Sequence, residues 1–241
     1  MVPLLKAPHL ESPHGFTSRA GGVSTGPFAT LNLSQSVGDD PRAVDENRRR
    51  VLAAFGAPPL VRLSQVHGSR AVTVEAPGVY EADAAVTRTL GLLLSVSAAD
   101  CYPLLLEDPG TGAVGVAHAG WRGVAAGVVE NVVAAMEGLG AKREALRVAI
   151  GPGACGRCYQ VGPEVARAVG PAFARPDETA PGRYLLDLLA AIRARLLALG
   201  LAPENVWALD ACTIEDARFF SYRRQGKRSG RMWGLIQRAP L

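Results

Sequence analysis

A series of five short apolar runs between residues 60 and 117 constrains the fold more than any other feature of this sequence. Each run is bounded by Gly, Pro or Asp, and they cover residues 60–66, 71–75, 91–98, 103–107 and 113–117. Apolar runs of this length between turn-forming residues predict β-strands. Because strand follows strand here without an intervening helix, the chain cannot be a regular alternation of strands and helices.

Helices are predicted in three other places. Asp40-Pro41 opens the first, because proline is favoured at the first helical position. Residues 121–138 and 183–199 carry apolar side chains at helical spacing, and glycines follow both segments. Further strands are predicted at residues 146–150, 206–209, 219–222 and 232–237, and residues 15–38 are expected to form a strand and a long loop. This mixed order predicts an α/β sandwich with mixed sheets rather than a doubly wound nucleotide-binding fold.

Length and composition fit one domain over residues 1–241, since 48% of the residues are hydrophobic and can form a large core. The segment 171–182 is not linker-like enough to divide the chain. The first residues lack the basic and apolar segments of a signal peptide, and no window holds about 18 uncharged apolar residues. Four cysteines are too few for a disulfide scaffold. We therefore expect a cytoplasmic protein without a membrane-spanning helix.

The net charge of +4 is spread along the chain, apart from a basic run at residues 223–231. A mild, dispersed excess of this kind is weak support for nucleic-acid binding, and it fits an anionic small substrate such as phosphate at least as well. We therefore expect small-molecule partners, with no nucleic acid and no membrane, and a monomer or small homo-oligomer.

Three candidate metal ligands stand at the ends of predicted strands: His67, Cys101 and His118. Zinc accepts imidazole nitrogen and cysteine thiolate, and a catalytic zinc site leaves its fourth position open for water or substrate. The spacings between the three residues are long, so these residues alone favour two core histidines and one buried cysteine over a metal site.

Local motifs favour the metal interpretation. Two of them, Ser97-Ala98-Ala99-Asp100-Cys101-Tyr102-Pro103 and His118-Ala119-Gly120-Trp121-Arg122-Gly123, are together very specific. With Thr17-Ser18-Arg19-Ala20-Gly21-Gly22-Val23-Ser24, Gln65-Val66-His67-Gly68 and Phe219-Phe220-Ser221-Tyr222-Arg223-Arg224, they make the chain resemble the YfiH-like family over nearly its whole length. This family is also called the laccase-domain or polyphenol-oxidase-type family. Ser34 departs from the pattern, because a glycine is common at that position.

The resemblance implies that His67, Cys101 and His118 bind zinc and form the catalytic centre. It also implies a four-layer α/β/β/α sandwich with mixed, bifurcated sheets. Members of the family are similar to purine nucleoside phosphorylases acting on adenosine, inosine and S-methyl-5′-thioadenosine, and some also deaminate adenosine. The substrates would then be a nucleoside and phosphate.

Phosphorolysis needs a site for a phosphate dianion, which guanidinium groups bind through paired charge-assisted hydrogen bonds. The candidates are Arg19, Arg122 and Arg223, each of which is equally well a solvated surface charge. Asn32 either bonds the ribose or base or structures its loop. Trp121 is either a stacking platform for a purine or an anchor at the start of a helix.

Two other enzyme classes use the same residues. A Cys-His thiol hydrolase would use Cys101 as the nucleophile and a histidine as the base. A multicopper laccase needs on the order of ten histidines, and the chain has four, although weak oxidase activity with added copper can arise at an open Cys/His site. A regulatory module that keeps a structural zinc is a non-enzymatic alternative. Cys155 and Cys158 are interpreted as a structural turn, with a disulfide as the variant, and Cys212 as a small buried strand residue.

Overall fold

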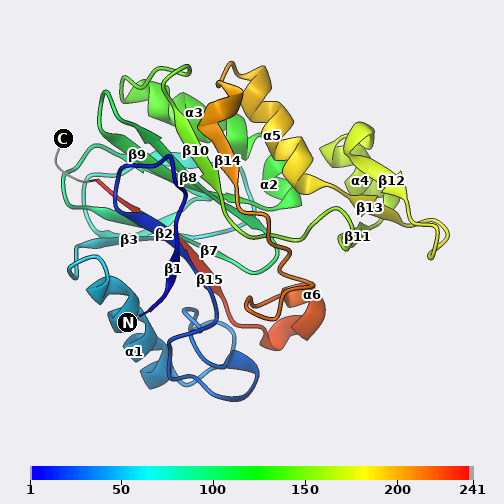
Figure 1. Cartoon of the computed structure of the whole chain (residues 1–241), viewed down its shortest axis with the longest axis horizontal. Helices are drawn as coiled ribbons and strands as arrows, with labels where there is room; N and C mark the ends of the chain where they lie inside the picture. Colours follow the sequence, from blue (N-terminus) through cyan, green and yellow to red (C-terminus); the bar gives the residue numbers. More distant parts are fainter. Residues whose placement is uncertain (1, 239–241) are drawn as a thin grey trace.

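The computed structural model describes residues 2–238, in which two six-stranded mixed sheets lie face to face (Figure 1). In spatial order the first sheet contains β1 (Leu4–Leu5), β2 (His14–Thr17), β15 (Met232–Gln237), β7 (Leu93–Ala98), β3 (Leu60–Ser64) and β5 (Gly78–Glu81). The second contains β14 (Val206–Ala208), β10 (Arg147–Ile150), β8 (Tyr102–Asp108), β9 (Ala113–Ala119), β6 (Ala84–Thr87) and β4 (Ala71–Thr73). Each sheet combines parallel and antiparallel pairs, as the sequence predicts.

Helices cover the outer face of each sheet, which completes four layers. The helix α1 (Pro41–Ala53) lies on the first sheet, and α3 (Val128–Gly138) and α5 (Leu188–Ala198) lie on the second (Figure 1). Strand β8 shows why its apolar run is continuous. Successive side chains point to opposite faces of a strand, so Leu104 and Leu106 pack toward the helices while Leu105 packs between the sheets. The α/β/β/α arrangement is therefore confirmed.

The helix predicted at residues 121–138 is two helices. The first, α2 (Trp121–Ala125), is separated from α3 by Gly127, which has a left-handed backbone at φ 94°. Glycine adopts this conformation without the steric penalty that other residues incur, so the chain turns here. The predicted apolar face is nevertheless buried, including Val128, Val132 and Met136.

Two other predictions were wrong. Residues 183–199 do not form one helix, because residues 184–186 pair as a strand and Asp187 then caps α5 by accepting a hydrogen bond from the Ala190 amide. Residues 219–222 do not form a strand. Phe219 and Phe220 are fully buried, but they lie in a loop. A buried loop segment is as apolar as a buried strand, so the two cannot be distinguished from this short run of sequence. The short helix α6 (Tyr222–Gln225) follows them.

A small third sheet projects from the end of the sandwich with α4 (Pro163–Val169), to the right in Figure 1. Its strands are β11 (Gln160–Val161), β13 (Tyr184–Leu186) and β12 (Ala174–Pro176). Short 3-10 helices occur at η1 (Gly26–Phe28), η2 (Pro171–Phe173), η3 (Pro203–Asn205) and η4 (Gly226–Arg228). Among residues 2–238, every helix is too short or too polar to cross a bilayer.

Candidate metal centre and active site

The fold brings the three predicted ligands together. His67 lies in the loop after β3, Cys101 lies between β7 and β8, and His118 is the penultimate residue of β9. Their ligand atoms all lie within 4.8 Å of one another, and the two imidazole rings meet edge to face at 4.8 Å between centroids. His118 is buried, Cys101 is half-buried and His67 is exposed. The cluster is therefore open to solvent on the His67 side.

The buried carboxylate of Asp83 organises two of the three ligands. Its Oδ1 lies 2.8 Å from His118 Nδ1 and accepts a hydrogen bond from the His67 amide at 3.0 Å. Its Oδ2 accepts hydrogen bonds from the amides of Val66 at 3.1 Å and Gly68 at 2.7 Å. An ionised carboxylate only accepts hydrogen bonds, so Nδ1 of His118 carries the proton and Nε2 is left to bind a metal. Such carboxylate–histidine pairs accompany zinc-ligating histidines.

Sequence reasoning did not select Asp83. The available signal was an acidic residue directly before the apolar run Ala84–Thr87, a position where an unpaired charge would be costly to bury.

Cys101 and His118 favour the ionised forms of both side chains. Burial alone would raise the pKa of the Cys101 thiol, but the charge and hydrogen bond of His118, with a hydrogen bond from His67, lower this pKa to about 6. Burial would likewise lower the pKa of His118, yet Cys101 and the hydrogen bond to Asp83 raise it to about 9. A thiolate is the form of cysteine that binds metals and attacks electrophiles.

Strained backbone holds two of the loops. His67 has φ 59° and Asp100, next to Cys101, has φ 84°, a left-handed region that is uncommon for residues other than glycine. Asp100 is fixed by three hydrogen bonds. Its carboxylate accepts from Thr213 Oγ1 and from the Arg223 amide, both at 2.7 Å, and its carbonyl accepts from the Ala154 amide at 2.8 Å. Strain of this kind persists only where the surroundings over-determine the conformation, and it clusters at functional sites.

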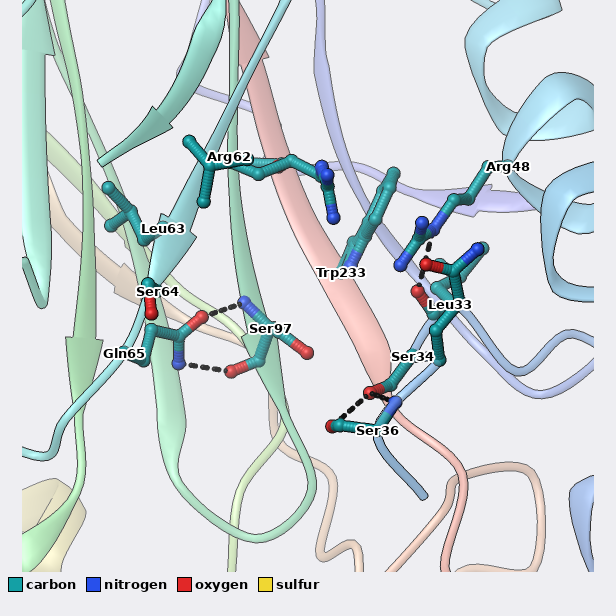
Figure 2. A pocket seen from close by; sticks show the side chains of 13 residues that line it. Leu33, Ser34, Ser36, Arg48, Arg62, Leu63, Ser64, Gln65, Ser97 and Trp233 are labelled. Atoms are coloured by element: carbon teal, nitrogen blue, oxygen red, sulfur yellow. Dashed lines mark hydrogen bonds between the residues drawn. The ribbon is translucent and has the colours of Figure 1, made fainter. Parts of the chain in front are cut away.

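Gln65 ties the His67 loop to the Cys101 loop. Its side-chain amide donates a hydrogen bond to the Ser97 carbonyl and accepts one from the Ser97 amide, each at 2.7 Å (Figure 2). The pair therefore extends the contact between β3 and β7 beyond the last backbone pair of the ladder and sets the separation of the two ligand-bearing loops.

Gly120 provides the space that the cluster needs. A Cβ atom at this position would lie 2.9 Å from Cys101 Sγ and 3.4 Å from His67 Cδ2. The first distance is shorter than any ordinary contact, so a side chain here would displace Cys101. Close packing against Cys101 thus explains why the His118-Ala119-Gly120 motif ends in glycine.

The candidate phosphate ligands occupy different places. Arg223 is exposed, lies 4.8 Å over the Tyr159 ring and donates to the Gln160 carbonyl at 2.7 Å. Arg122 is exposed and stacks on Trp121 at 4.4 Å. Arg19 donates to the Ala29 carbonyl at 2.6 Å beneath the Phe220 ring. Their common role in binding phosphate stays a prediction.

Arg231 is a further cation that the sequence did not single out as a site residue. Burial lowers the pKa of its guanidinium, whereas the nearby Cys101 and Asp100 act to raise it. It is half-buried and donates to the carbonyls of Ser229 and Gly230. Its charge therefore reaches the thiolate from the β15 side.

Asn32 and Trp121 have contacts that match their structural alternatives. Asn32 is fully buried and bonds Ser34, Asp39 and the Arg231 amide, which commits both ends of its side chain to the loop. Trp121 starts α2 and packs against the core between the second sheet and its helices.

A cavity of about 310 Å³ lies beside the cluster without including it. Arg48 and Arg62 lie on either side of Trp233 in its wall, and Gln65 and Ser97 form another part of the lining (Figure 2). Its volume is at the lower limit of small-molecule pockets. The His67–Cys101–His118 cluster stays the candidate for the chemistry, because it combines metal-ligating groups with a thiol whose pKa is lowered.

The remaining cysteines form a second cluster, in which Cys155 and Cys158 lie in a turn, as predicted, and no disulfide joins them. The structure places Cys155, Cys158, Cys212 and Glu215 with their ligand atoms within 4.8 Å of one another, so this cluster could hold a metal ion. Cys212 is buried, as expected, but it forms an isolated bridge with Gly153 in a turn rather than lying within a strand. Cys212 and Glu215 lie 54 or more positions after Cys158 in the sequence, so no local motif reveals that they join it.

Comparisons with known proteins identify one family model and several similar sequences and structures. The family model described as multi-copper polyphenol oxidoreductase laccase matches residues 13–239. A protein of Deinococcus radiodurans named purine nucleoside phosphorylase is 48% identical over 98% of this chain and 92% of its own length. The crystal structure of YlmD from Geobacillus stearothermophilus matches with a TM-score of 0.89 and 34% identity over all of both chains. That of the hypothetical protein YfiH from Bacillus licheniformis matches with a TM-score of 0.87 and 28% identity over 93% of this chain and 91% of its own.

Proposed function

The chain belongs to the multi-copper polyphenol oxidoreductase laccase family, and from that premise we propose that it is a zinc-dependent purine nucleoside phosphorylase. The relative from Deinococcus radiodurans, which is named for this activity, carries the proposal. We further propose adenosine, inosine and S-methyl-5′-thioadenosine as substrates, with deamination of adenosine as a second activity.

In the proposed reaction a phosphate oxygen forms a bond to C1′ of the ribose while the C1′–N9 bond breaks. The products are ribose 1-phosphate and the purine, which takes up a proton. The protein must therefore hold a dianion beside C1′ and support the leaving base. Arg122, Arg223 and Arg231 supply positive charge on the elements that carry or flank His118 and Cys101, and guanidinium groups suit this task.

His67, Cys101 and His118 would hold the zinc ion. The donor set fits zinc, because it offers two imidazoles and a thiol whose pKa is already lowered to about 6, with Asp83 behind His118. When bound, zinc supplies Lewis acidity to an oxygen of substrate or water. Asp83 orients His118, and Asp100 fixes the backbone that carries Cys101.

The test measures hypoxanthine released from inosine by the zinc-containing protein, with and without inorganic phosphate. We expect release only with phosphate, and loss of the activity in Cys101→Ser. Equal release without phosphate would instead indicate hydrolysis. The proposal would be refuted if, in the presence of phosphate, inosine released no hypoxanthine and neither adenosine nor S-methyl-5′-thioadenosine released adenine. Ammonia release from adenosine without phosphate tests the deaminase activity separately.

A thiol hydrolase remains the second candidate, because the Cys101–His118 pair has the lowered thiol pKa of such enzymes. Metal content separates the two: a metal-free chain that hydrolyses an activated ester through a covalent Cys101 adduct would favour the hydrolase. Added copper tests for polyphenol oxidase activity at the same cluster.

A further inference from the structure

The second cluster joins two turns that are distant in the sequence. Cys155 and Cys158 lie in the turn after β10, and Cys212 and Glu215 lie in the turn after β14. Cys155 Sγ lies 3.7 Å from Cys158 Sγ and 3.8 Å from Glu215 Oε2. Cys158 Sγ lies 3.0 Å from Glu215 Oε1, and the Cys155 amide donates to Cys212 Sγ at 3.4 Å. The four ligand atoms thus lie within 4.8 Å of one another.

The separation of the two sulfur atoms in the Cys-x-x-Cys turn is that of two zinc-bound thiolates. Two thiolates about 2.3 Å from a tetrahedral zinc ion lie about 3.8 Å apart, close to the 3.7 Å between Cys155 and Cys158. A disulfide brings two sulfur atoms to about 2.0 Å, and all four cysteines here are free.

Local geometry supports the donors. The amides of Cys158 and Tyr159 both donate to the Cys155 carbonyl at 3.0 Å, which closes the Cys-x-x-Cys turn. Arg157, between the two cysteines, donates to Glu215 Oε2 at 2.9 Å. It therefore orients the carboxylate and offsets part of the excess negative charge that three thiolates and a carboxylate would leave around a divalent ion.

We propose that Cys155, Cys158, Cys212 and Glu215 form a second, structural metal site of the zinc class. Four protein donors close the coordination sphere, in contrast to the three donors of the first cluster, and closed sites are structural. Thiolate ligands favour zinc over magnesium or calcium.

The second site also supports the first. Thr213, next to Cys212, donates to the carboxylate of Asp100, and Ala154, next to Cys155, donates to its carbonyl. Both metal-bearing turns therefore hold the residue that precedes Cys101. An ion joining the turns would fix the strained backbone of Asp100 from two sides.

Metal analysis of the full chain, purified with zinc and without chelator, tests the site. We expect two equivalents per chain in the wild type. Cys158→Ser and Glu215→Gln should each retain one equivalent, and Cys101→Ser should lose the other one. Glu204→Gln is the control: it makes the same change from carboxylate to carboxamide at an exposed residue outside both clusters. This variant should keep two equivalents of metal. Cobalt replaces zinc as a spectroscopic probe, and the thiolate-to-cobalt absorption should fall far more in Cys158→Ser than in Cys101→Ser.

One equivalent in the wild type, unchanged by Cys158→Ser and Glu215→Gln, would overturn the proposal. So would a Cys155–Cys158 disulfide, seen as two thiols protected from alkylation until reduction. Glu215→Gln changes a half-exposed surface side chain and so serves if Cys158→Ser does not fold. The metal count is independent of whether the protein phosphorolyses nucleosides.

Discussion

Asp83→Asn tests whether a buried carboxylate organises the candidate metal centre. The substitution keeps the size of the side chain but replaces one acceptor oxygen with an NH2 group. If that group occupies the Oδ2 position, it faces the donor amides of Val66 and Gly68, which now lie 3.1 and 2.7 Å from an acceptor. His118 would keep a neutral acceptor in place of a charged one.

The magnitude follows from the bonds that are lost. A hydrogen bond to a charged group contributes about 1.5–3 kcal/mol, so two of them set an upper range of about 3–6 kcal/mol in the free energy of unfolding. The His67 loop is exposed and can relax, and we therefore expect a loss of about 2–4 kcal/mol. Removing such a carboxylate behind a metal-ligating histidine weakens metal binding by about 10–100-fold. That loss is about 1.4–2.7 kcal/mol in binding free energy.

Zinc affinity, measured by competition with a chromophoric chelator, and urea unfolding read out the two effects. Asp108→Asn is the matched control: this buried carboxylate also accepts amide hydrogen bonds, from Gly110 at 2.8 Å and Lys142 at 3.0 Å. It lies at the far end of β8 from Cys101, about 20 Å away along the strand. Asp108→Asn should lose stability with unchanged zinc affinity. Wild-type zinc affinity in folded Asp83→Asn would refute the role assigned to Asp83.

Three further predictions address the site and the fold. In the metal-free protein, Cys101 is a thiolate above its pKa of about 6, so the rate of its alkylation by iodoacetamide should be close to the maximum at pH 7. Peptide mass spectrometry measures this rate as a function of pH, and a midpoint of the rate profile above pH 8 would contradict the prediction. Gly120→Ala places a methyl group 2.9 Å from Cys101 Sγ and should lower zinc affinity and phosphorolysis by about 10–100-fold, whereas Gly138→Ala, where that methyl group has open space, should change neither. Asp40→Ala removes the cap bonded to the Arg42 amide and should reduce the free energy of unfolding by about 1 kcal/mol while zinc affinity stays the same.

The strands of the sandwich could be predicted from the sequence because burial imposes local patterns. Runs such as Tyr102–Asp108 and Met232–Gln237 are apolar on both faces, since each sheet is covered on both sides. The predictions failed where the same local pattern of apolar residues fits both a helix and a strand. Residues 184–186 pair with β11 and β12, and that pairing overrides the helical stripe that includes Leu185.

The motifs predicted which three residues come together as candidate ligands, but not the residues that support them. Asp83 reaches His67 and His118 across 16 and 35 positions, and Thr213 reaches Asp100 across 113. Cys212 joins Cys155 across 57 positions. These contacts depend on the order of strands in two sheets, and no periodicity in the sequence records that order.

Two buried aspartates hold the three candidate ligands in place. Asp83 holds the His67 loop and the ring of His118, while Asp100 holds the turn that carries Cys101 against residues 154, 213 and 223. Each carboxylate meets several hydrogen-bond donors. Burial would raise the pKa of Asp83, but its hydrogen bonds to His118 and to the amides of Gly68 and Val66 lower this pKa. The negative charge of Asp83 behind His118 favours a divalent cation in an open three-donor site. We therefore propose that the arginines on the solvent side, away from Asp83 and Asp100, hold the substrate phosphate, with the reacting ribose between the cluster and those guanidinium groups.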